Sequence, residues 1–333
     1  MAARLGSHTY TITNETRWRH RFTIATAVTT VLLLAWGAFV TSINAGLAVP
    51  DWPSSFNSYD PFNPWPEWWK LTPVLAEHGH RLLGALTGLF TLCLAVWTWL
   101  YDPRKWMRML GLGALVLVTL QGVLGGLRVV LISLDLAIVH ACVAQIFFAL
   151  IVGMVLFTSR AWLNGELGSP SIPNVARLRR FSLMTAGLLY IQIILGALLR
   201  HPGTGIDPVL AGLHIAGAVA TTLAIVLLFF RFRRHVRSTR IAWPAMHILL
   251  LLLSIQVILG VMAYFVTLDD AGILEPSNLQ VLVNTSHMVT GALLMGACAA
   301  VVYDAFRLPR TSESTLQARA ENSVILNEPT TIP

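Results

Sequence analysis

The sequence predicts an all-α polytopic membrane protein with eight transmembrane helices, arranged as two pseudo-symmetric four-helix bundles. Of its 333 residues, 55% are hydrophobic and only 12% are charged, which is more apolar surface than a soluble domain of this size can hide from water. The charged residues are clustered, and the neutral stretches between them exceed the roughly 18 residues that mark a membrane-spanning helix. A short motif of glutamine and glycine recurs along the chain and indicates an internal repeat.

Eight apolar stretches are long enough to cross a bilayer. We place them at residues 22–43, 77–100, 107–130, 137–158, 180–200, 209–231, 243–267 and 281–303. The first stretch is longer than the apolar region of a secretory signal peptide and more spans follow it, so we expect it to be retained.

The spans divide the chain into five expected segments. These are a cytoplasmic tail (1–21), an N-terminal four-helix half (22–158), a cytoplasmic linker (159–180), a C-terminal four-helix half (181–303) and a second cytoplasmic tail (304–333). Both tails are polar and lack helical periodicity, so we expect them to be unstructured.

The basic residues set the expected orientation. Of the 23 Lys and Arg residues, nearly all fall on one side of the predicted spans, and the exceptions are Lys70, Arg81, Arg128 and Arg200. The positive-inside rule then places both termini in the cytoplasm, which we take to be that of a bacterium, with the protein in its inner membrane. Topology and membrane lipid explain the net charge of +7, and nucleic acid is excluded as a partner because no basic cluster belongs to a nucleic-acid-binding fold.

The largest predicted outer loop, residues 44–76, is rich in aromatic residues and proline. Such a composition suits a rigid cap at the level of the lipid headgroups. Two interpretations remain open, an aromatic belt that anchors the protein and a lid over a site that faces outwards.

A repeat of Gln-x-x-Leu-Gly lies near the outer end of three odd-numbered spans, at residues 121–125, 192–196 and 256–260. Across a short outer loop from each copy, the next span begins with a histidine: His140, His214 and His287. A fourth histidine, His80, lies near the outer end of the second span. Each half has an even number of spans, so the two halves are expected to form a parallel repeat.

Four histidines at one depth, one on each even-numbered span, predict metal ligation. A lone histidine in an apolar helix is usually a hydrogen-bonded core residue, but ionisable groups inside a membrane bundle are costly and usually face a functional interior. Neutral imidazole is a good axial ligand for haem iron. We therefore predict two bis-histidine haem sites, one formed by His80 and His140 and one by His214 and His287.

Zinc or copper is the competing interpretation of these histidines. A mononuclear site for either metal usually adds cysteine or carboxylate ligands. The cysteines, Cys93, Cys142 and Cys298, lie in apolar runs without metal-ligand spacing and are predicted to be core residues. Only Glu77 supplies a carboxylate in the helices at this depth.

Arginine and glutamate accompany the histidines at the outer ends. Arg128 and Arg200 each follow a copy of the repeat, and guanidinium groups suit haem propionates, although a snorkelling helix anchor is the alternative. Glu77 and His80 share a helix face. Glu77 is therefore a candidate for proton transfer at the haem, or else a structural partner of Arg81, and His78 is the second choice as ligand.

The motifs together resemble the haem A synthase family over about residues 22–303. They are Asn-Ala-Gly-Leu-Ala-Val-Pro-Asp-Trp-Pro at residues 44–53, Glu-His-Gly-His-Arg at residues 77–81, and the single histidines His140, His214 and His287. The resemblance implies a membrane oxidoreductase that oxidises the C8 methyl of haem O to the formyl group of haem A, through a hydroxymethyl intermediate, for haem-copper oxidases.

The resemblance also implies roles for individual residues. His214 and His287 match the ligands of a haem b in the C-terminal half, with Arg200 beside it. His80 and His140 match the histidines of the half that takes the substrate haem O, with Arg81 and Arg128 beside it. Glu77 matches a glutamate proposed to act in catalysis. Many bacterial members carry a cysteine pair in the first outer loop, whereas residues 44–76 contain none, so electron transfer through outer thiols is not expected here.

Two other classes of function remain open at this point. An electron-transfer cytochrome b with two bis-histidine haems, which changes neither haem, would use the same four histidines. A transporter is disfavoured because discontinuous helices at the midplane are expected of one. Haem O synthase is a candidate partner, and the sequence does not identify the electron acceptor.

Overall fold

The computed structural model describes residues 13–63, 65–164, 175–200, 207–235, 243–269 and 275–308. Eight helices in this part of the chain are long and apolar enough to span a membrane, as predicted. They are α1 (Asn14–Ser42), α3 (Thr72–Tyr101), α4 (Lys105–Val130), α5 (Leu134–Thr158), α7 (Val175–Leu198), α8 (Pro208–His235), α9 (Trp243–Asp269) and α10 (Asn278–Arg307). Two short helices, α2 (Glu67–Lys70) and α6 (Arg160–Leu163), complete the described secondary structure, which contains no strand.

Several helices extend beyond the apolar stretches that predict them. Helix α1 begins at Asn14 because the Thr13 side chain accepts a hydrogen bond from Thr16 N and caps the helix, so the expected tail of residues 1–21 is helical in its last part. Helix α6 and the start of α7 likewise lie within the expected linker 159–180. Most of each predicted tail, residues 1–12 and 309–333, lies outside the described residues.

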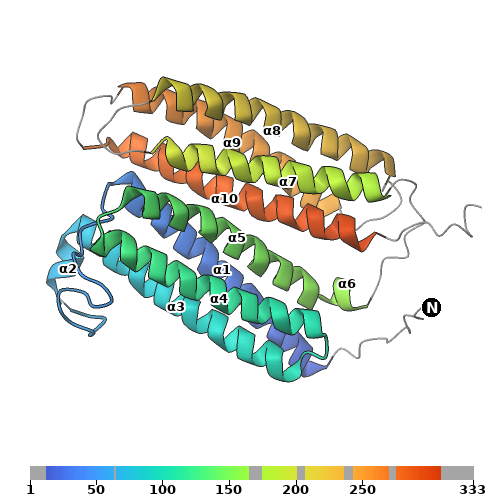
Figure 1. Cartoon of the computed structure of the whole chain (residues 1–333), viewed down its shortest axis with the longest axis horizontal. Coiled ribbons are helices and arrows are strands. Elements are labelled where there is room, and N and C mark those ends of the chain that lie inside the picture. Colours follow the sequence, from blue (N-terminus) through green and yellow to red (C-terminus); the bar gives the residue numbers. More distant parts are fainter. Residues whose placement is uncertain are drawn as a thin grey trace, which may run out of the picture.

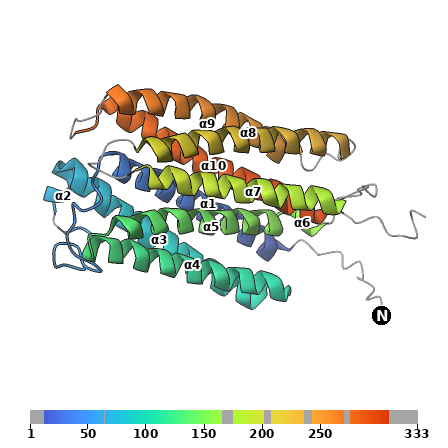
Figure 2. The same cartoon turned by 45° about the horizontal axis from the view of Figure 1, so that its top comes forward.

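The long helices form two groups that lie side by side (Figures 1 and 2). Helices α1, α3, α4 and α5 pack together, and α7 to α10 form the second group, which is consistent with the two predicted four-helix bundles. Helix α10 contacts both α1 and α5 and is the most buried of the eight long helices described. It therefore forms the centre of the contact between the halves.

Polar side chains join the two halves at different depths. Thr285 Oγ1 donates to Ser42 Oγ at 2.9 Å near one end, and Tyr303 OH donates to Ala149 O at 3.1 Å towards the other. The Tyr303 ring lies against Gly153 on α5. The missing side chain of that glycine lets α5 and α10 approach closely, so the halves are held in one register.

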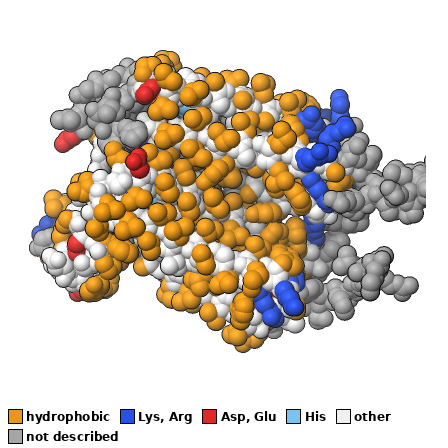
Figure 3. Space-filling view, in the orientation of Figure 1, with side chains coloured by type: hydrophobic (Ala, Val, Ile, Leu, Met, Phe, Trp, Pro, Cys, Tyr) orange, Lys and Arg blue, Asp and Glu red, His pale blue; other side chains and the backbone are white. Residues whose placement is uncertain are grey.

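The surface is that of a multi-pass membrane protein. Large apolar side chains are exposed along the long helices and cover the face seen in Figure 3. Most of the Lys and Arg side chains visible on this face lie at one end of the bundle (Figure 3), whereas the segment between α1 and α3 lies at the other end (Figure 1). This separation of charge is the one that the positive-inside rule describes.

A buried ionic network ties three segments together at the basic end. Asp102 follows α3 and is fully buried, and its carboxylate contacts Arg104 Nη2 at 2.7 Å and Arg19 Nη1 at 3.1 Å. Arg104 also donates to Phe157 O at the end of α5. Burial raises the pKa of Asp102, but the hydrogen bonds and charge of Arg104, together with Arg19, outweigh it and lower the pKa below its usual range.

Replacement of Asp102 by Asn is expected to reduce stability by about 3–5 kcal/mol, because it removes the buried charge that pairs with Arg104 and Arg19 and leaves the buried Arg19 with only Glu15, 3.5 Å away. Chemical denaturation of the detergent-solubilised protein measures the change. Asp135→Asn, an exposed position in the first turn of α5, is the matched control. Because the folded-state pKa is lowered, this contribution is complete at neutral pH and is lost as the pH falls below about 4. Equal stability of Asp102→Asn and Asp135→Asn would contradict a role for the network.

Candidate haem sites

The four histidines singled out from the sequence form two pairs with nearly the same geometry. The ring centroids of His80 on α3 and His140 on α5 lie 6.5 Å apart, with an angle of 78° between the ring planes. Those of His214 on α8 and His287 on α10 also lie 6.5 Å apart, at 74°. Each half of the protein therefore places two imidazoles, from two even-numbered spans that follow one another in the chain, face to edge.

This spacing fits a metal ion held between the two rings. Imidazole nitrogen binds metals at about 2 Å, so one ion shared by two rings places their centroids about 6 Å apart. Among the described residues, buried Nδ1 atoms of His80, His140 and His287 have no hydrogen-bond partner. No group of three or more His, Cys, Asp or Glu residues in the same part of the chain could hold a metal ion. The donor set therefore fits bis-histidine haem better than a mononuclear zinc or copper site.

Each of these histidines lies against a glycine of a neighbouring helix. The distance from imidazole Cε1 to the place where a Cβ would stand on the glycine is between 2.9 and 3.2 Å in all four cases. The pairs are Gly37 with His80, Gly125 with His140, Gly196 with His214 and Gly260 with His287. The glycine of the repeated motif is therefore the surface on which the imidazole ring rests.

Gly37 supports His80 as the motif glycines support the other three histidines, but it does not belong to a Gln-x-x-Leu-Gly motif. In α1 the five residues that end in Gly37 are Leu-Leu-Ala-Trp-Gly, so Leu33 stands where the other copies have glutamine. Trp36 donates to Ala76 O on α3 at 2.8 Å. A search for the glycine alone, at the same depth in the first span, would have found it.

Replacement of Gly260 by Val is expected to lower the haem content of the C-terminal half by about an order of magnitude, because an altered support of a ligand typically costs 10–100-fold in affinity. The Cβ would stand 3.1 Å from His287 Cε1 and displace the ring. Haem-to-protein ratios of the purified variants measure the loss. Gly212→Val is the control, since Gly212 in α8 has open space around its Cβ position. An equal loss of haem in both variants would contradict the role of Gly260 as a support for His287.

Glutamine side chains also reach the histidines of the C-terminal half. Gln192 Nε2 lies 3.0 Å from His214 Nδ1 and donates to His214 O at 2.8 Å. Gln256 Nε2 lies 3.3 Å from His287 Nε2. In the C-terminal half, the glutamine that begins each motif and the glycine that ends it therefore contact the same imidazole.

Glu77 lies in a polar cluster that holds the outer loop against α3. It is 4% exposed, and its carboxylate accepts hydrogen bonds from Val49 N at 2.9 Å and from Arg81 Nη2 at 3.0 Å. Arg81 donates further to Val49 O and, through Nη1, to Asp51 O and Ser54 O. Glu77 is thus a partner of Arg81, and both terminal nitrogens of Arg81 are engaged by the loop.

The loop is folded on itself by Asp51. Its carboxylate accepts hydrogen bonds from Ser54 Oγ and from the backbone N–H groups of Phe56 and Asn57. Partial burial raises the pKa of Asp51, and these hydrogen bonds outweigh it and lower the pKa below its usual value. The turn is therefore held by an ionised carboxylate at neutral pH.

His78 and His80 point to different partners. His78 is buried, its Nε2 donates to Pro61 O at 2.7 Å, and its ring lies 5.1 Å from that of Trp68. His80 faces His140 across the bundle. The geometry therefore favours His80, the first choice from the sequence, over His78 as a metal ligand.

Arg128 lies in the last turn of α4, and Arg200 lies just after the end of α7. Arg128 donates to Gly46 O of the outer loop. The Trp52 ring of the same loop covers Gly126, where any side chain would collide with it, so α4 and the loop are closely packed.

Arg200 connects the two halves. Its Nη2 donates to Thr41 O at the end of α1 at 3.1 Å, and its Nη1 lies 3.4 Å from Met288 Sδ, next to His287. Burial lowers the pKa of Arg200 to about 10, so the guanidinium stays charged at neutral pH.

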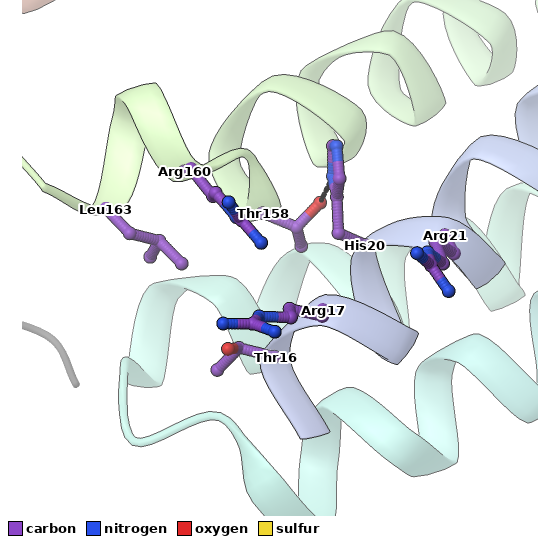
Figure 4. Close-up of a pocket in the computed structure, with 7 residues that line it drawn as sticks. All are labelled: Thr16, Arg17, His20, Arg21, Thr158, Arg160 and Leu163. Carbon is purple, nitrogen blue, oxygen red and sulfur yellow. Dashed lines mark hydrogen bonds between the residues drawn. The ribbon is translucent and has the colours of Figure 1, made fainter. Parts of the chain in front are cut away.

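A separate small pocket lies at the opposite, basic end of the bundle (Figure 4). It measures about 100 Å³ and is lined by Thr16, Arg17, His20, Arg21, Thr158, Arg160 and Leu163. His20 Nδ1 lies 3.0 Å from Thr158 Oγ1. None of the eight residues predicted for the haem sites lines it.

Comparison with known proteins matches this chain to one family. The family described as cytochrome oxidase assembly protein (COX15-CtaA) matches residues 20–208. The chain is 26% identical over 255 residues to the haem A synthase of Halalkalibacterium halodurans, and this alignment covers 70% of this chain and 82% of the relative. It is 25% identical over 266 residues to the haem A synthase of Shouchella clausii, covering 72% and 85%. A haem A synthase of Symbiobacterium thermophilum is 30% identical over 191 residues, covering 54% and 59%.

The matched region contains most of α1 and all of α2 to α5, with the outer loop, His80 and His140. The two longer alignments cover more than two thirds of the chain. The protein therefore belongs to the haem A synthase family of cytochrome oxidase assembly proteins, whose members work in haem A biosynthesis.

Proposed function

We propose that the protein is a haem A synthase that oxidises the C8 methyl group of haem O to a formyl group, through a hydroxymethyl intermediate, for assembly of a haem-copper oxidase. One observation favours this over a cytochrome b with two equivalent haems. The two histidine pairs have the same geometry, but only His80 has a buried glutamate three residues before it. The corresponding positions before His214 and His287 are Ala211 and Asn284.

In this proposal His80 and His140 hold the iron of the substrate haem O, and His214 and His287 hold a haem b. Haem b would supply one-electron transfer. Arg81 and Arg128 lie on the substrate side and Arg200 on the other, where guanidinium groups suit carboxylates such as haem propionates. Because Arg81 and Arg128 also hold the outer loop, the loop and the substrate propionates would share the same cations.

Glu77 is the proton acceptor of the proposed reaction. Conversion of a methyl to a formyl group with water as the oxygen source releases four electrons and four protons. The electrons pass to a one-electron acceptor, and the protons need a base near the methyl carbon. Glu77 is the buried carboxylate of this cluster, and Arg81 and Val49 N–H hold its two oxygens in place.

The outer loop serves as a lid over this half in the proposal. Arg81 binds three of its backbone carbonyl groups, and Arg128 binds a fourth. With the basic end of the bundle in the cytoplasm of a bacterium, the loop lies on the outer face of the inner membrane. Haem O synthase, which makes the substrate, is the expected partner.

Conversion of haem O tests the proposal directly. The protein is expressed in membranes that contain haem O, and the extracted haems are separated and identified by mass. We expect haem A and hydroxylated haem O, together with one haem b per protein in a pyridine haemochrome spectrum. Two retained b-type haems with unchanged haem O would instead identify an electron-transfer cytochrome b.

A further inference from the structure

The two halves differ in how side chains support the paired histidines. In the C-terminal half, the Gln192 amide lies against His214 and the Gln256 amide against His287. A ligating histidine donates its free ring N–H, and the amide oxygens Gln192 Oε1 and Gln256 Oε1, which are buried without a partner in the described structure, can accept it once each amide is turned over. Such hydrogen bonds fix the tautomer and ring orientation, and their loss typically costs 10–100-fold in affinity. Both imidazoles of this half therefore have a neighbouring amide that holds them.

Glycines on the histidine-bearing helices make room for these amides. A Cβ at Gly291, four residues after His287, would lie 3.3 Å from Gln256 Nε2. A Cβ at Gly217, three residues after His214, would collide with Gln192 Oε1. Each glutamine therefore occupies a space that the facing helix leaves open for it.

Leu33 stands in the corresponding place beside His80. It precedes Gly37 by four residues, as Gln256 precedes Gly260. It also faces a glycine four residues after the histidine, because Leu33 Cδ1 lies 4.0 Å from the Cβ position of Gly84. A leucine has neither a donor nor an acceptor, so it gives His80 no hydrogen bond.

His140 receives no amide hydrogen bond either. Gln121 begins the copy of the motif that faces it, but among the described residues the buried Gln121 Nε2 has no partner. Nδ1 of His80 and of His140 also has no partner, but neither has Nδ1 of His287 in the other half, so the halves differ in the side-chain amides and not in these ring nitrogens. The N-terminal half thus has the same pair of rings and the same glycine supports without the amide hydrogen bonds.

We propose that Gln192 and Gln256 are positioning residues that make the C-terminal half retain its haem, whereas Leu33 leaves His80 free enough for the N-terminal half to exchange its own. This inference rests on the proposed function, in which one half holds a resident haem and the other takes a substrate and must release a product. In this proposal the rate of haem exchange depends on whether a side-chain amide four positions before the supporting glycine reaches the histidine, as it does for Gln192 and Gln256 but not for Gln121.

Transfer of haem to excess apomyoglobin measures the exchange. The purified protein is loaded with haem O in its ferric state, and two phases are expected, a fast one from the N-terminal half and a slow one from the C-terminal half. His140→Ala and His287→Ala assign the phases. The first removes one histidine of the N-terminal pair, and the second removes one histidine of the C-terminal pair. The signal of low-spin ferric haem in electron paramagnetic resonance reports ring orientation in the same samples.

Leu33→Gln is expected to slow the fast phase about tenfold, and Gln256→Met or Gln192→Met to speed the slow phase about tenfold and shift the low-spin signal. Leu33→Met is the control, because methionine has nearly the length of glutamine without its amide and should leave the fast phase unchanged. Equal effects of Leu33→Gln and Leu33→Met, or a slow phase unmoved in both glutamine variants, would overturn the inference.

The outcomes separate this inference from the proposed function. If haem O is converted to haem A but the glutamine and leucine variants leave both phases unchanged, the inference fails and the proposed function stands. If the phases shift as expected but haem O is never converted, the positioning role stands and the synthase proposal fails.

Discussion

Replacement of Glu77 by Gln is expected to lower the rate of haem O conversion by at least about 100-fold, because a positioned general base typically contributes 10²–10⁴-fold. Glutamine keeps the shape of the side chain and one oxygen that accepts from Val49 N. It removes the negative charge that pairs with Arg81 and the capacity to take a proton at neutral pH. Single-turnover conversion of bound haem O, followed by mass analysis of the extracted haem, measures the rate.

Asp51→Asn is the matched control for this experiment. It makes the same change from carboxylate to amide in the loop that Glu77 holds, and it removes the carboxylate that orders the turn at Ser54 and Phe56. We expect conversion within a few-fold of the unchanged protein, because the described contacts of the Asp51 carboxylate are with Ser54, Phe56 and Asn57 and not with Glu77 or a predicted haem ligand. Full conversion by Glu77→Gln would rule out the proton-accepting role, and equal losses in both variants would assign Glu77 to loop structure alone.

Replacement of His80 by Ala is expected to abolish haem O conversion and to halve the haem content of the fully loaded protein. Removing one of the two histidines that would hold the iron leaves the N-terminal half with His140 alone, whereas His214 and His287 are untouched. Haem-to-protein ratios and the low-spin haem signal measure the loss. The haem b of the C-terminal half should remain at one per protein.

His78→Ala is the partner variant, because it removes an imidazole only two positions away. His78 donates to Pro61 O and meets the Trp68 ring edge to face, so its loss should loosen the loop and leave both haems bound. If His78→Ala loses the substrate haem and His80→Ala keeps it, the ligand assignment is reversed. The pair of variants therefore decides which of the two histidines binds iron.

The positions of the membrane spans could be read from the chain alone. Apolar length is a local property, because a helix must cover the hydrocarbon core whatever its neighbours are. Apolar length does not predict the start of α1, which begins at Asn14 and not at residue 22. Arg19 looks like part of a solvated tail in the sequence, yet it is buried because Asp102, far away along the chain, lies beside it.

The candidate haem ligands could also be named in advance, because the repeat sets His140, His214 and His287 at one depth. Their pairing was also predicted from the sequence, whereas the equal spacing of the two pairs comes from the folded structure. Gly37 escaped notice because the glutamine of the motif is absent from α1. Its importance lies in a contact with α3, and no local pattern records such a contact.

By itself, the sequence determined the number of spans, the depth of the four histidines and the resemblance to a family, since these depend on hydrophobic length, helical spacing and short motifs. Only the tertiary structure decided that His80 rather than His78 faces His140, that Glu77 and Arg81 hold the outer loop, and that Leu33 occupies the place of a glutamine. The physical reason is that each of these is a contact between helices or loops distant in the chain, where close packing selects one neighbour among many.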